Sequence, residues 1–238
     1  MIAQLLNLML LKKMWQMAGK NNRILLWRHG QTDWNIINRF QGHSDIALNK
    51  VGIYQAELAA PIIAGMEPTA ILSSDLSRAR DTASKLGEIV NMEVLIDERL
   101  RETNGGHWEG KTGAENRAAD LENFVRWIDG NDNPAGTIGE KRSEVAARAS
   151  AAIDEFLGDK ENQLVVVATH GGTARCLIGH YLHLPMAHWG KIGGLSNARW
   201  SILQTSPKGW HLAEHNAGSI LEPVFGEESG ADVPDHVR

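Results

Sequence analysis

Two histidines in this chain stand directly after apolar runs, at positions where a buried strand is expected to end in a loop. The pair Arg28-His29 follows the run 24–27, and His170 comes shortly after the run 164–168. In open α/β sheets, ligands bind beyond the carboxyl ends of the strands. Two histidines and an arginine at that edge can converge on one anion, a set of groups that suits phosphoryl transfer through a histidine.

His29 is the candidate nucleophile of this pattern. A neutral imidazole, with an ordinary pKa of about 6.5, is largely unprotonated at neutral pH and can attack phosphorus. A histidine in a simple turn is the alternative, but Arg28 before it and Gly30 after it favour the catalytic interpretation.

His170 is the candidate hydrogen-bond donor to the phosphate. When protonated, it can donate a hydrogen bond to a phosphate and stabilise charge on the transferring group. Gly171 and Gly172 follow it, and their lack of a side chain lets the backbone come close to a ligand where the next helix begins. A capping or core-facing histidine is the alternative.

Arg28 and Arg78 are candidate phosphate clamps, because a guanidinium offers a planar fork of donors that matches phosphoryl oxygens and stays charged. Arg78 comes after a strand end and a polar turn, so the sequence predicts that it lies in the first turn of a helix. A helix N-terminus adds its own affinity for anions. Arginines on helices usually face solvent, and Arg80 is the better candidate for that ordinary role.

Glu102 is the candidate proton donor and acceptor. A carboxylic acid near the leaving oxygen can protonate it, and the resulting carboxylate can then activate water. The sequence alone does not separate Glu102 from Glu98 and Glu109, which compete for this role.

The composition narrows the classes of function. The formal net charge is −5, so no general basic field attracts nucleic acid or a membrane, and we expect the partner to be a small-molecule phosphate ester. Cys176 is the single cysteine, which excludes an intrachain disulfide and fits a cytoplasmic location. The sequence has no P-loop, no dinucleotide-binding glycine motif and no His/Asp/Glu cluster at metal-ligand spacing, so we expect neither a metal nor a cofactor. A homodimer is one option for the oligomeric state.

Apolar runs that alternate with amphipathic stretches predict an α/β fold. The order of elements implies a mostly parallel sheet with helices on both faces. The last two strands, joined by 205–209, are expected to form a hairpin at one edge, and 130–139 is a loop or the start of an inserted lid. The expected strands cover 23–27, 70–72, 93–96, 164–168, 198–204 and 210–215, and the expected helices cover 50–64, 76–90, 117–128, 143–157 and 173–181.

Five sequence blocks, taken in order, resemble those of the histidine phosphatase superfamily, also called the phosphoglycerate mutase-like family. Arg-His-Gly by itself is weak support, whereas the ordered set covers residues 23 to about 216 and is specific. The blocks are 26–35 with 39–42, 45–48, 73–79, 100–102 with 106–110, and 169–172.

The resemblance implies a three-layer α/β/α fold and a phosphohistidine intermediate on His29. It places Arg28, Arg78 and His170 in the phosphate pocket, and it assigns the proton transfer to Glu102. It also brings residues that would bind substrate to the edge of the pocket, namely Asn35, Gln41, Gly42 and Gly171.

Within the superfamily, part of the chain is similar to the actinobacterial glucosyl-3-phosphoglycerate phosphatases. The segments that carry this similarity are 193–200, 73–76, 80–83 and 85–87.

The main alternative is a phosphoglycerate mutase that depends on bisphosphoglycerate. After the acid residue, residues 104–113 keep Lys111 but lack the rest of the mutase pattern, and Asn133-Pro134 is not a proline run. A broad-specificity acid phosphatase is a further alternative. A catalytically inactive binding module of the same fold would be expected to lack the nucleophile or an arginine, and this chain keeps both.

Aromatic and basic side chains near the site blocks bear on the substrate. An aromatic face can stack on a sugar ring while an extra arginine pairs with a carboxylate, which favours a small phosphorylated sugar-acid or organic acid. Burial of the same aromatics in a core is an equal alternative. The side chains concerned are Trp34, Arg39, Phe40, His43 and Trp108.

One large domain is expected in this chain. We interpret residues 1–17 as an N-terminal extension that ends at a second candidate start, Met17, with a docking helix as the alternative. Its apolar stretch 2–11 is shorter than the roughly 20 residues that a membrane span needs. Residues 18–221 are the histidine phosphatase domain that the resemblance implies, and 222–238 are expected to be a loosely ordered tail with little periodicity.

Overall fold

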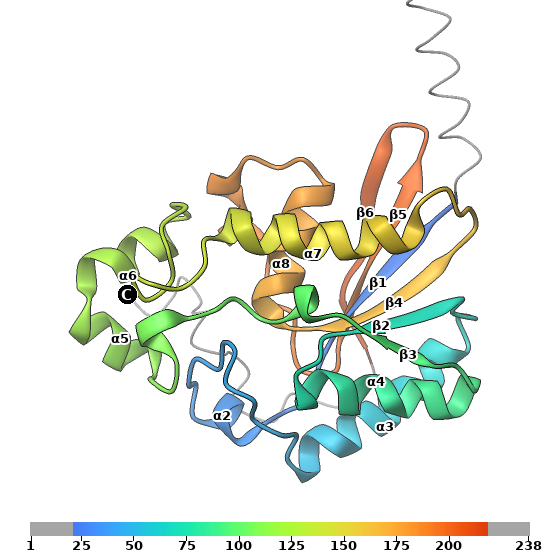
Figure 1. The fold of residues 1–238 in the computed structure, drawn as a ribbon, viewed down its shortest axis with the longest axis horizontal. Helices are drawn as coiled ribbons and strands as arrows, with labels where there is room; N and C mark the ends of the chain where they lie inside the picture. Colours follow the sequence, from blue (N-terminus) through green and yellow to red (C-terminus); the bar gives the residue numbers. More distant parts are fainter. Residues whose placement is uncertain (1–20, 219–238) are drawn as a thin grey trace, which may run out of the picture.

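The computed structural model describes residues 21–218 and is built on one sheet with the strand order β3-β2-β4-β1-β5-β6 (Figure 1). The expected N-terminal extension, 1–17, and the expected tail, 222–238, lie outside the described residues. The strands are β1 (Arg23–Arg28), β2 (Ala70–Ser73), β3 (Val94–Ile96), β4 (Leu164–Thr169), β5 (Trp200–Ser206) and β6 (Gly209–Ala217).

The sheet is mostly parallel, as predicted. β4 pairs in parallel with β1 and β2, and β2 pairs in parallel with β3. β5 is antiparallel to β1, and β6 is antiparallel to β5, so the predicted hairpin forms one edge of the sheet. Its turn is confined to Pro207 and Lys208, because the ladder continues through the pair Ser206 and Gly209.

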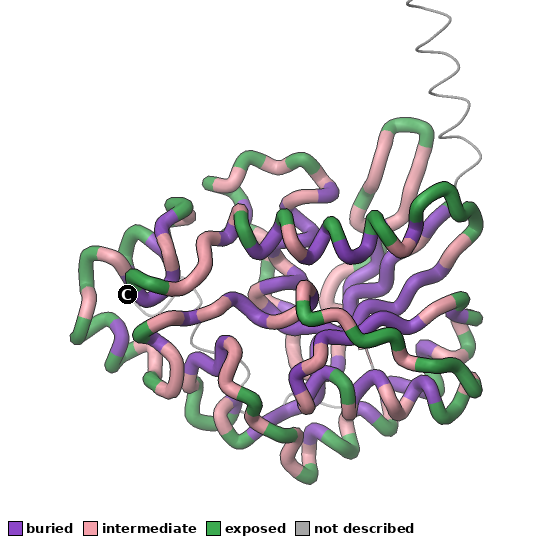
Figure 2. The backbone as a smooth tube through the Cα atoms, in the orientation of Figure 1, coloured by how far each residue is buried: buried purple, intermediate pink, exposed green. Residues whose placement is uncertain are grey.

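Helices cover both faces of the sheet and complete the predicted three layers. On one face lie α3 (Lys50–Ala64) and α4 (Ser77–Val90), and on the other lie α7 (Arg142–Leu157) and α8 (Gly171–Tyr181) (Figure 1). Successive residues of a strand point to opposite faces. Accordingly, Leu26 of β1 belongs to the apolar cluster that contains Ile153 of α7, and Leu25 belongs to the cluster that contains Ala83 of α4. The central strands are buried along their length (Figure 2).

The predicted helix over 117–128 is wrong in its boundaries. The structure has two helices here, α5 (Gly113–Ala119) and α6 (Leu121–Ile128), which are separated at Asp120. The Asp120 side chain accepts a hydrogen bond from a backbone N–H of α6, so it caps that helix instead of continuing α5. A capping box at Thr112 starts α5 earlier than expected.

Short helical turns escape the periodic pattern, because a single turn is too short to show a 3.6-residue repeat. The loop predicted over 130–139 is confirmed. The unpredicted turns are α2 (Asp33–Ile36), η1 (Glu98–Leu100), η2 (Gly106–Trp108) and η3 (Met186–Lys191).

The carboxyl ends of the central strands meet at one edge of the sheet. Arg28 of β1 pairs with Thr169 of β4, and Ser73 of β2 pairs with Ala168. Beyond this edge lies a lobe made of α5, α6 and the loop 130–139 (Figure 1). Phe124, Trp127 and Ala135 of the lobe form an apolar cluster with Phe40 and with Trp108 of η2.

Candidate active site

His29 directly follows β1 and is 3% exposed. Its backbone N–H donates to the Thr169 carbonyl (3.0 Å), which extends the pairing of β1 with β4 by one residue. Its Nδ1 lies 2.7 Å from the Gly30 carbonyl oxygen, and because a carbonyl only accepts, Nδ1 carries the proton. The lone pair of the neutral ring is therefore on Nε2, the atom that can attack phosphorus.

Burial and positive neighbours keep both site histidines neutral. Desolvation lowers the pKa of His29 well below its ordinary 6.5, and the charges of Arg78 and Arg28 lower it further. Desolvation and then Arg78 also lower the pKa of His170 well below 6.5. Neutral His29 is the nucleophilic form. For His170 the lowered pKa likewise favours a neutral ring in the free site, whereas from the sequence we considered what a protonated ring could do.

His170 still offers a donor in its neutral form. The two histidine rings lie side by side, with centroids 5.2 Å apart. Nε of Arg78 donates to Nδ1 of His170 (3.3 Å), so the ring proton is on Nε2. That Nε2 is buried and has no hydrogen-bond partner among the described residues, although His170 occupies the N-cap position of α8. An oxygen of a bound anion would satisfy it.

Arg78 is fully buried in the first turn of α4, as predicted, while Arg80 is exposed and pairs with Asp81. Arg78 donates from Nη1 to the Ser44 carbonyl and from Nη2 to the Gly42 carbonyl, both at 2.8 Å. Desolvation lowers the pKa of Arg78 to about 10, so the guanidinium remains charged at neutral pH. The buried cation is thus held in place with further donor capacity for an anion.

Arg28 supplies a second buried guanidinium, at 2% exposure, from the last residue of β1. Its Nη1 donates to the Leu195 carbonyl (2.6 Å) in the segment before β5. The two arginines come from different elements, β1 and α4, so only the tertiary fold brings both guanidinium groups into one pocket.

Glu102 is 6% exposed, and its carboxylate is bound to the first turn of α8. It accepts from the backbone N–H groups of Thr103 (2.8 Å), Gly172 (3.1 Å) and Thr173 (3.1 Å). A Cβ at position 172 would lie 2.5 Å from Oε1 of Glu102, so a glycine there lets the carboxylate approach the helix end. The site therefore holds a carboxylate whose position is well defined.

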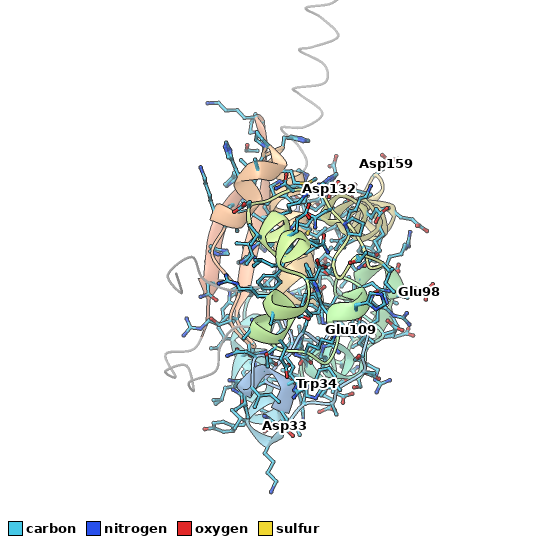
Figure 3. The ribbon with its side chains drawn as sticks, turned by 90° about the vertical axis from the view of Figure 1, so that its left-hand side faces the viewer. Asp33, Trp34, Glu98, Glu109, Asp132 and Asp159 are labelled. Carbon is cyan, nitrogen blue, oxygen red and sulfur yellow. The ribbon has the colours of Figure 1, made fainter. Side chains whose placement is uncertain are left out.

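The two competing carboxylates occupy different surroundings. Glu109 accepts hydrogen bonds from the backbone N–H groups of His43, Ser44 and Gly105, so it joins two loops. The side chain of Glu98 is 76% exposed and lies at the periphery of the molecule (Figure 3). Geometry favours Glu102 for proton transfer, because neither competitor lines the pocket.

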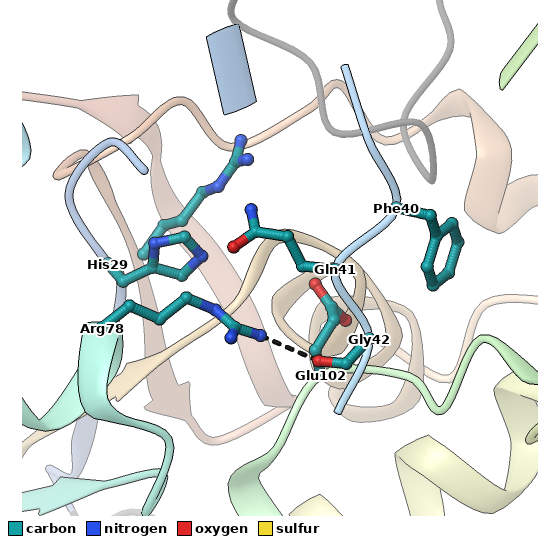
Figure 4. Close-up of a pocket in the computed structure, with 7 residues that line it drawn as sticks. His29, Phe40, Gln41, Gly42, Arg78 and Glu102 are labelled. Atoms are coloured by element: carbon teal, nitrogen blue, oxygen red, sulfur yellow. Dashed lines mark hydrogen bonds between the residues drawn. The ribbon is translucent and has the colours of Figure 1, made fainter. Parts of the chain in front are cut away.

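A pocket of about 250 Å³, including the open space at its mouth, collects most of the predicted residues (Figure 4). In this view the amide of Gln41 lies between the His29 ring and Glu102. Gly42 adopts a φ of +51°, and a Cβ there would lie 2.0 Å from Oε1 of Glu109, which explains the glycine. The pocket is lined by Arg28, His29, Phe40, Gln41, Gly42, Arg78 and Glu102.

Three predicted residues lie beside this pocket and do not line it. His170 contacts two residues that line the pocket, His29 and Arg78. Asn35 is fully buried, and its Nδ2 has no hydrogen-bond partner among the described residues. Gly171 is buried at the start of α8.

The aromatic side chains near the site were expected either to stack on a sugar ring or to lie in a core, and they differ in their burial. Phe40 and Trp108 are buried in the cluster of the lobe, so the core interpretation is confirmed for them, although Phe40 also lines the pocket. Trp34 is partly exposed. His43 is partly exposed, and its Nε2 donates to the Glu102 carbonyl (2.9 Å).

Asn197 is a site neighbour that the sequence reasoning missed. Its Nδ2 donates to the carbonyl of His29 (3.0 Å) and to Oδ1 of Asn35 (3.3 Å). The next residue, Ala198, donates its N–H to the carbonyls of Arg28 and His29. The segment is next to the nucleophile only because β5 pairs with β1, and nothing in the sequence reveals that pairing.

The described part of the chain, 21–218, has neither a cluster of metal-ligating side chains nor a membrane-spanning helix. No group of three or more His, Cys, Asp or Glu side chains there is arranged to hold a metal ion. No helix in the same range is both long and apolar enough to cross a membrane.

Comparison with known proteins gives the same family from sequence and from structure. The sequence model of the histidine phosphatase superfamily (branch 1) matches residues 24–218. Glucosyl-3-phosphoglycerate phosphatase of Mycobacterium tuberculosis is 40% identical over 190 residues, which cover 76% of this chain and 84% of that protein. The probable phosphoglycerate mutase GpmB of Yersinia pestis is 31% identical over 212 residues, which cover 89% of this chain and 96% of that protein.

The solved structures agree with this result. Mycobacterial glucosyl-3-phosphoglycerate phosphatase, determined in complex with VO3, superposes with a TM-score of 0.75 at 38% identity and covers 82% of this chain and 99% of that one. The family match spans nearly all of the described residues and includes every block that carries the site. The chain therefore belongs to the histidine phosphatase superfamily and is an enzyme of the phosphatase class.

Proposed function

We propose that this enzyme is a phosphomonoesterase that works through a phosphohistidine on His29. One observation carries the proposal: a buried neutral histidine, with its lone pair on Nε2, shares a pocket with two buried arginines and a carboxylate. The nucleophile is His29, the arginines are Arg28 and Arg78, and the carboxylate is Glu102. These groups supply a nucleophile, positive charge for the phosphoryl oxygens and a proton for the leaving oxygen.

In the first step, Nε2 of His29 attacks phosphorus, and the bond from phosphorus to the ester oxygen breaks. Glu102 gives its proton to that oxygen, so the product leaves as a neutral alcohol. Arg28 and Arg78 bind the phosphoryl oxygens through charged donors, and the Nε2–H of His170 adds another.

In the second step, water attacks the phosphohistidine. The Glu102 carboxylate takes a proton from that water, the bond between phosphorus and Nε2 breaks, and inorganic phosphate leaves. His29 returns to its neutral form, and Glu102 is protonated again for the next cycle. The atoms balance with one ester and one water consumed and one alcohol and one phosphate formed.

The proposed reaction needs no metal ion and suits the cytoplasm. Arg28 and Arg78 provide the positive charge that a divalent cation supplies in many phosphotransfer enzymes. Cys176 is buried as a free thiol, a state that a reducing compartment preserves.

The substrate that we propose is a small phosphorylated sugar-acid, with glucosyl-3-phosphoglycerate as the leading candidate. This choice is supported by the relatives of that name at 40% identity, which cover three quarters of the chain. The VO3 complex of the mycobacterial relative supports an oxyanion pocket of the same kind in this chain. The relatives named as probable mutases, at 31% identity, keep phosphoglycerate mutase as the second candidate.

A panel of phosphate esters at equal concentration tests the proposal. We expect kcat/KM for glucosyl-3-phosphoglycerate to exceed that for an aryl phosphate and for 3-phosphoglycerate. If the aryl phosphate is turned over as well as the sugar-acid, the enzyme is a broad phosphatase. If 3-phosphoglycerate is isomerised when bisphosphoglycerate is added, and little phosphate is released, the enzyme is a mutase.

A further inference from the structure

The segment that carries Glu102, residues 99–104, belongs to no strand. It runs from η1 towards η2, and its backbone pairs with no neighbouring strand in the sheet. Backbone carbonyls that are buried without a partner are costly, so this segment needs donors from elsewhere. Side chains from other elements supply them: the Leu100 carbonyl accepts from Thr169 (2.8 Å), and the Arg101 carbonyl accepts from Thr173 (2.7 Å).

Arg148 of α7 contributes three such bonds, more than any other side chain. Its Nη1 donates to the carbonyls of Arg99 (2.6 Å) and Arg101 (2.8 Å), and its Nη2 donates to the carbonyl of Glu102 (2.9 Å). Its Nε and Nη2 donate to the two carboxylate oxygens of Glu140, at 2.7 and 2.9 Å. A guanidinium has five N–H donors, and Arg148 uses all five.

Glu140 holds Arg148 and the far end of the same segment together. Its Oε2 accepts from the N–H of Asn104 (2.8 Å), and its own N–H donates to the Asn104 carbonyl (2.9 Å). Burial opposes the ionisation of Glu140, but hydrogen bonds from Arg148 and Asn104 outweigh it and lower its pKa. The side chains of Arg148 and Glu140 are only 19% and 22% exposed, so water competes little with this pair.

The carboxylate of Glu102 has its own contacts, and these do not replace the clamp that Arg148 and Glu140 form on the backbone of this segment. Its bonds to the first turn of α8 fix the oxygens, but no strand fixes the backbone from which the side chain extends. His43 gives the Glu102 carbonyl its second donor, from the loop whose carbonyls bind Arg78. The Glu102 carbonyl is therefore held by His43 and Arg148 together, and Arg148 also binds the carbonyls of Arg99 and Arg101.

We propose that Arg148 is a positioning residue for catalysis: its guanidinium, held by Glu140, sets the position of the general acid Glu102 relative to His29. This inference rests on the proposed function, because it assumes that Glu102 transfers the proton. Arg148 does not line the pocket and acts only through the backbone that it binds. A displacement of roughly 1 Å in a reacting group costs about 100-fold in rate.

Arg148→Lys tests the inference, because lysine keeps the charge but has three donors and no planar fork. The readout is kcat/KM for a series of phosphate esters whose leaving groups range from aryl to alkyl. For the proposed mechanism kcat/KM covers the steps up to cleavage of the ester, so it isolates the role of the acid. We expect a loss of about 10- to 100-fold for alkyl esters and only a few-fold for aryl esters, which need little protonation.

Arg99→Lys is the matched control. Arg99 lies at the start of the same segment, but its guanidinium pairs with Asp97 and Glu155 and does not contact Glu102. We expect Arg99→Lys to keep the wild-type dependence on the leaving group. Thermal unfolding of both variants shows how much each substitution destabilises the fold.

Glu102→Gln, alone and combined with Arg148→Lys, distinguishes a failure of the role proposed for Glu102 from a failure of the role proposed for Arg148. If Arg148 acts through Glu102, adding Arg148→Lys to Glu102→Gln changes the leaving-group dependence little further. If Glu102→Gln itself leaves that dependence unchanged, the proposed role of Glu102 fails. If Glu102→Gln alters it but Arg148→Lys slows all esters equally, Arg148 is only structural and the inference is overturned. Should Arg148→Lys not fold, Glu140→Gln loosens the same clamp and is tested in the same series.

Discussion

The two halves of the site are built in different ways. The nucleophile half is attached to the ends of paired strands: His29 follows β1, His170 follows β4, and the ladder between these strands sets the spacing. The acid half is attached to the irregular segment 99–104, whose carbonyls are bound by side chains of α7, α8 and β4. One half is located by backbone pairing and the other by a few side-chain donors.

This difference decides where each half is sensitive to substitution. A ladder spreads the positioning of His29 over many backbone bonds, so its place depends less on any single side chain, even though Asn197 donates to its carbonyl. The acid half depends on individual hydrogen bonds, and the loss of one leaves buried groups unsatisfied. We therefore expect the nucleophile half to fail mainly through its own site residues, and the acid half also through residues that never touch the substrate.

In the nucleophile half, substitution of His29 should cause the largest loss of activity. We expect His29→Ala to lose more than about 10⁴-fold in turnover, because no phosphohistidine can form, while the ladder of β1 with β4 keeps the fold. Trapping acid-labile phosphate from radiolabelled substrate, with mapping of the labelled residue, checks the assignment. Label on any other residue of the wild-type enzyme would move the nucleophile elsewhere.

Arg78 comes next, with a loss of about 10²- to 10³-fold in kcat/KM expected for Arg78→Ala. The buried guanidinium supplies charge to the pocket and also binds the carbonyls of Gly42 and Ser44. Arg80→Ala on the same helix is the matched control, because the Arg80 side chain is 52% exposed and pairs only with Asp81 in the described structure. Equal losses in the two variants would contradict a phosphate-binding role for Arg78.

In the acid half, Glu102→Gln should be much more harmful to alkyl esters than Glu109→Gln. Glu109 joins the loop at His43 and Ser44 to Gly105, so its loss acts on stability and on all substrates alike. Measuring kcat/KM for one alkyl and one aryl ester in both variants makes the comparison. A stronger dependence on the leaving group in Glu109→Gln would transfer the acid role to that residue.

A smaller effect is expected in how activity and stability depend on pH, through the two histidines of the nucleophile half. Because the pKa of His29 lies well below 6.5, the nucleophile stays neutral, and we expect no fall in kcat/KM from its protonation between pH 7 and 6. For stability the sign is fixed by the unfolded chain, which takes up protons near pH 6.5 while folded His29 and His170 do not. Stability is therefore greatest above about pH 6.5 and is lost as the pH falls towards the folded pKa values.

Thermal unfolding at several pH values checks the second expectation. His29→Asn removes one of the two buried histidines, so its melting temperature should fall less than that of the wild type between pH 7 and 5. An equal fall in both proteins would show that His29 does not contribute to the pH dependence of stability.

The smallest expected effect is that of chelation. Arg28 and Arg78 supply the positive charge in the proposed mechanism, so exhaustive EDTA should leave kcat/KM unchanged. The check is activity before and after treatment. Loss of activity with EDTA and its recovery with Mg²⁺ or Mn²⁺ would show that the pocket has been misassigned.

Local chemistry made much of this site predictable from the sequence. An apolar run followed by Arg28-His29 predicts a strand end, and the turn before Arg78 predicts a helix N-terminus, and both are confirmed. Such signals depend on a few adjacent residues, so tertiary packing rarely overrides them. The prediction of one helix over 117–128 was wrong for a local reason as well. The Asp120 side chain accepts a backbone N–H and starts a new helix there.

Long-range contacts lie outside what the sequence by itself determined. The residue pattern alone left Glu98 and Glu109 in competition with Glu102 for the acid, because three carboxylates within twelve residues look alike until their surroundings are known. Only the family resemblance assigned the role to Glu102. The tertiary structure separated them by burial and by the N–H groups that each one receives. It alone placed Asn197 and Arg148, because each acts on backbone more than 40 residues away in the chain. Hydrogen bonds between such distant residues depend on how the layers pack, and no local pattern in the sequence records that packing.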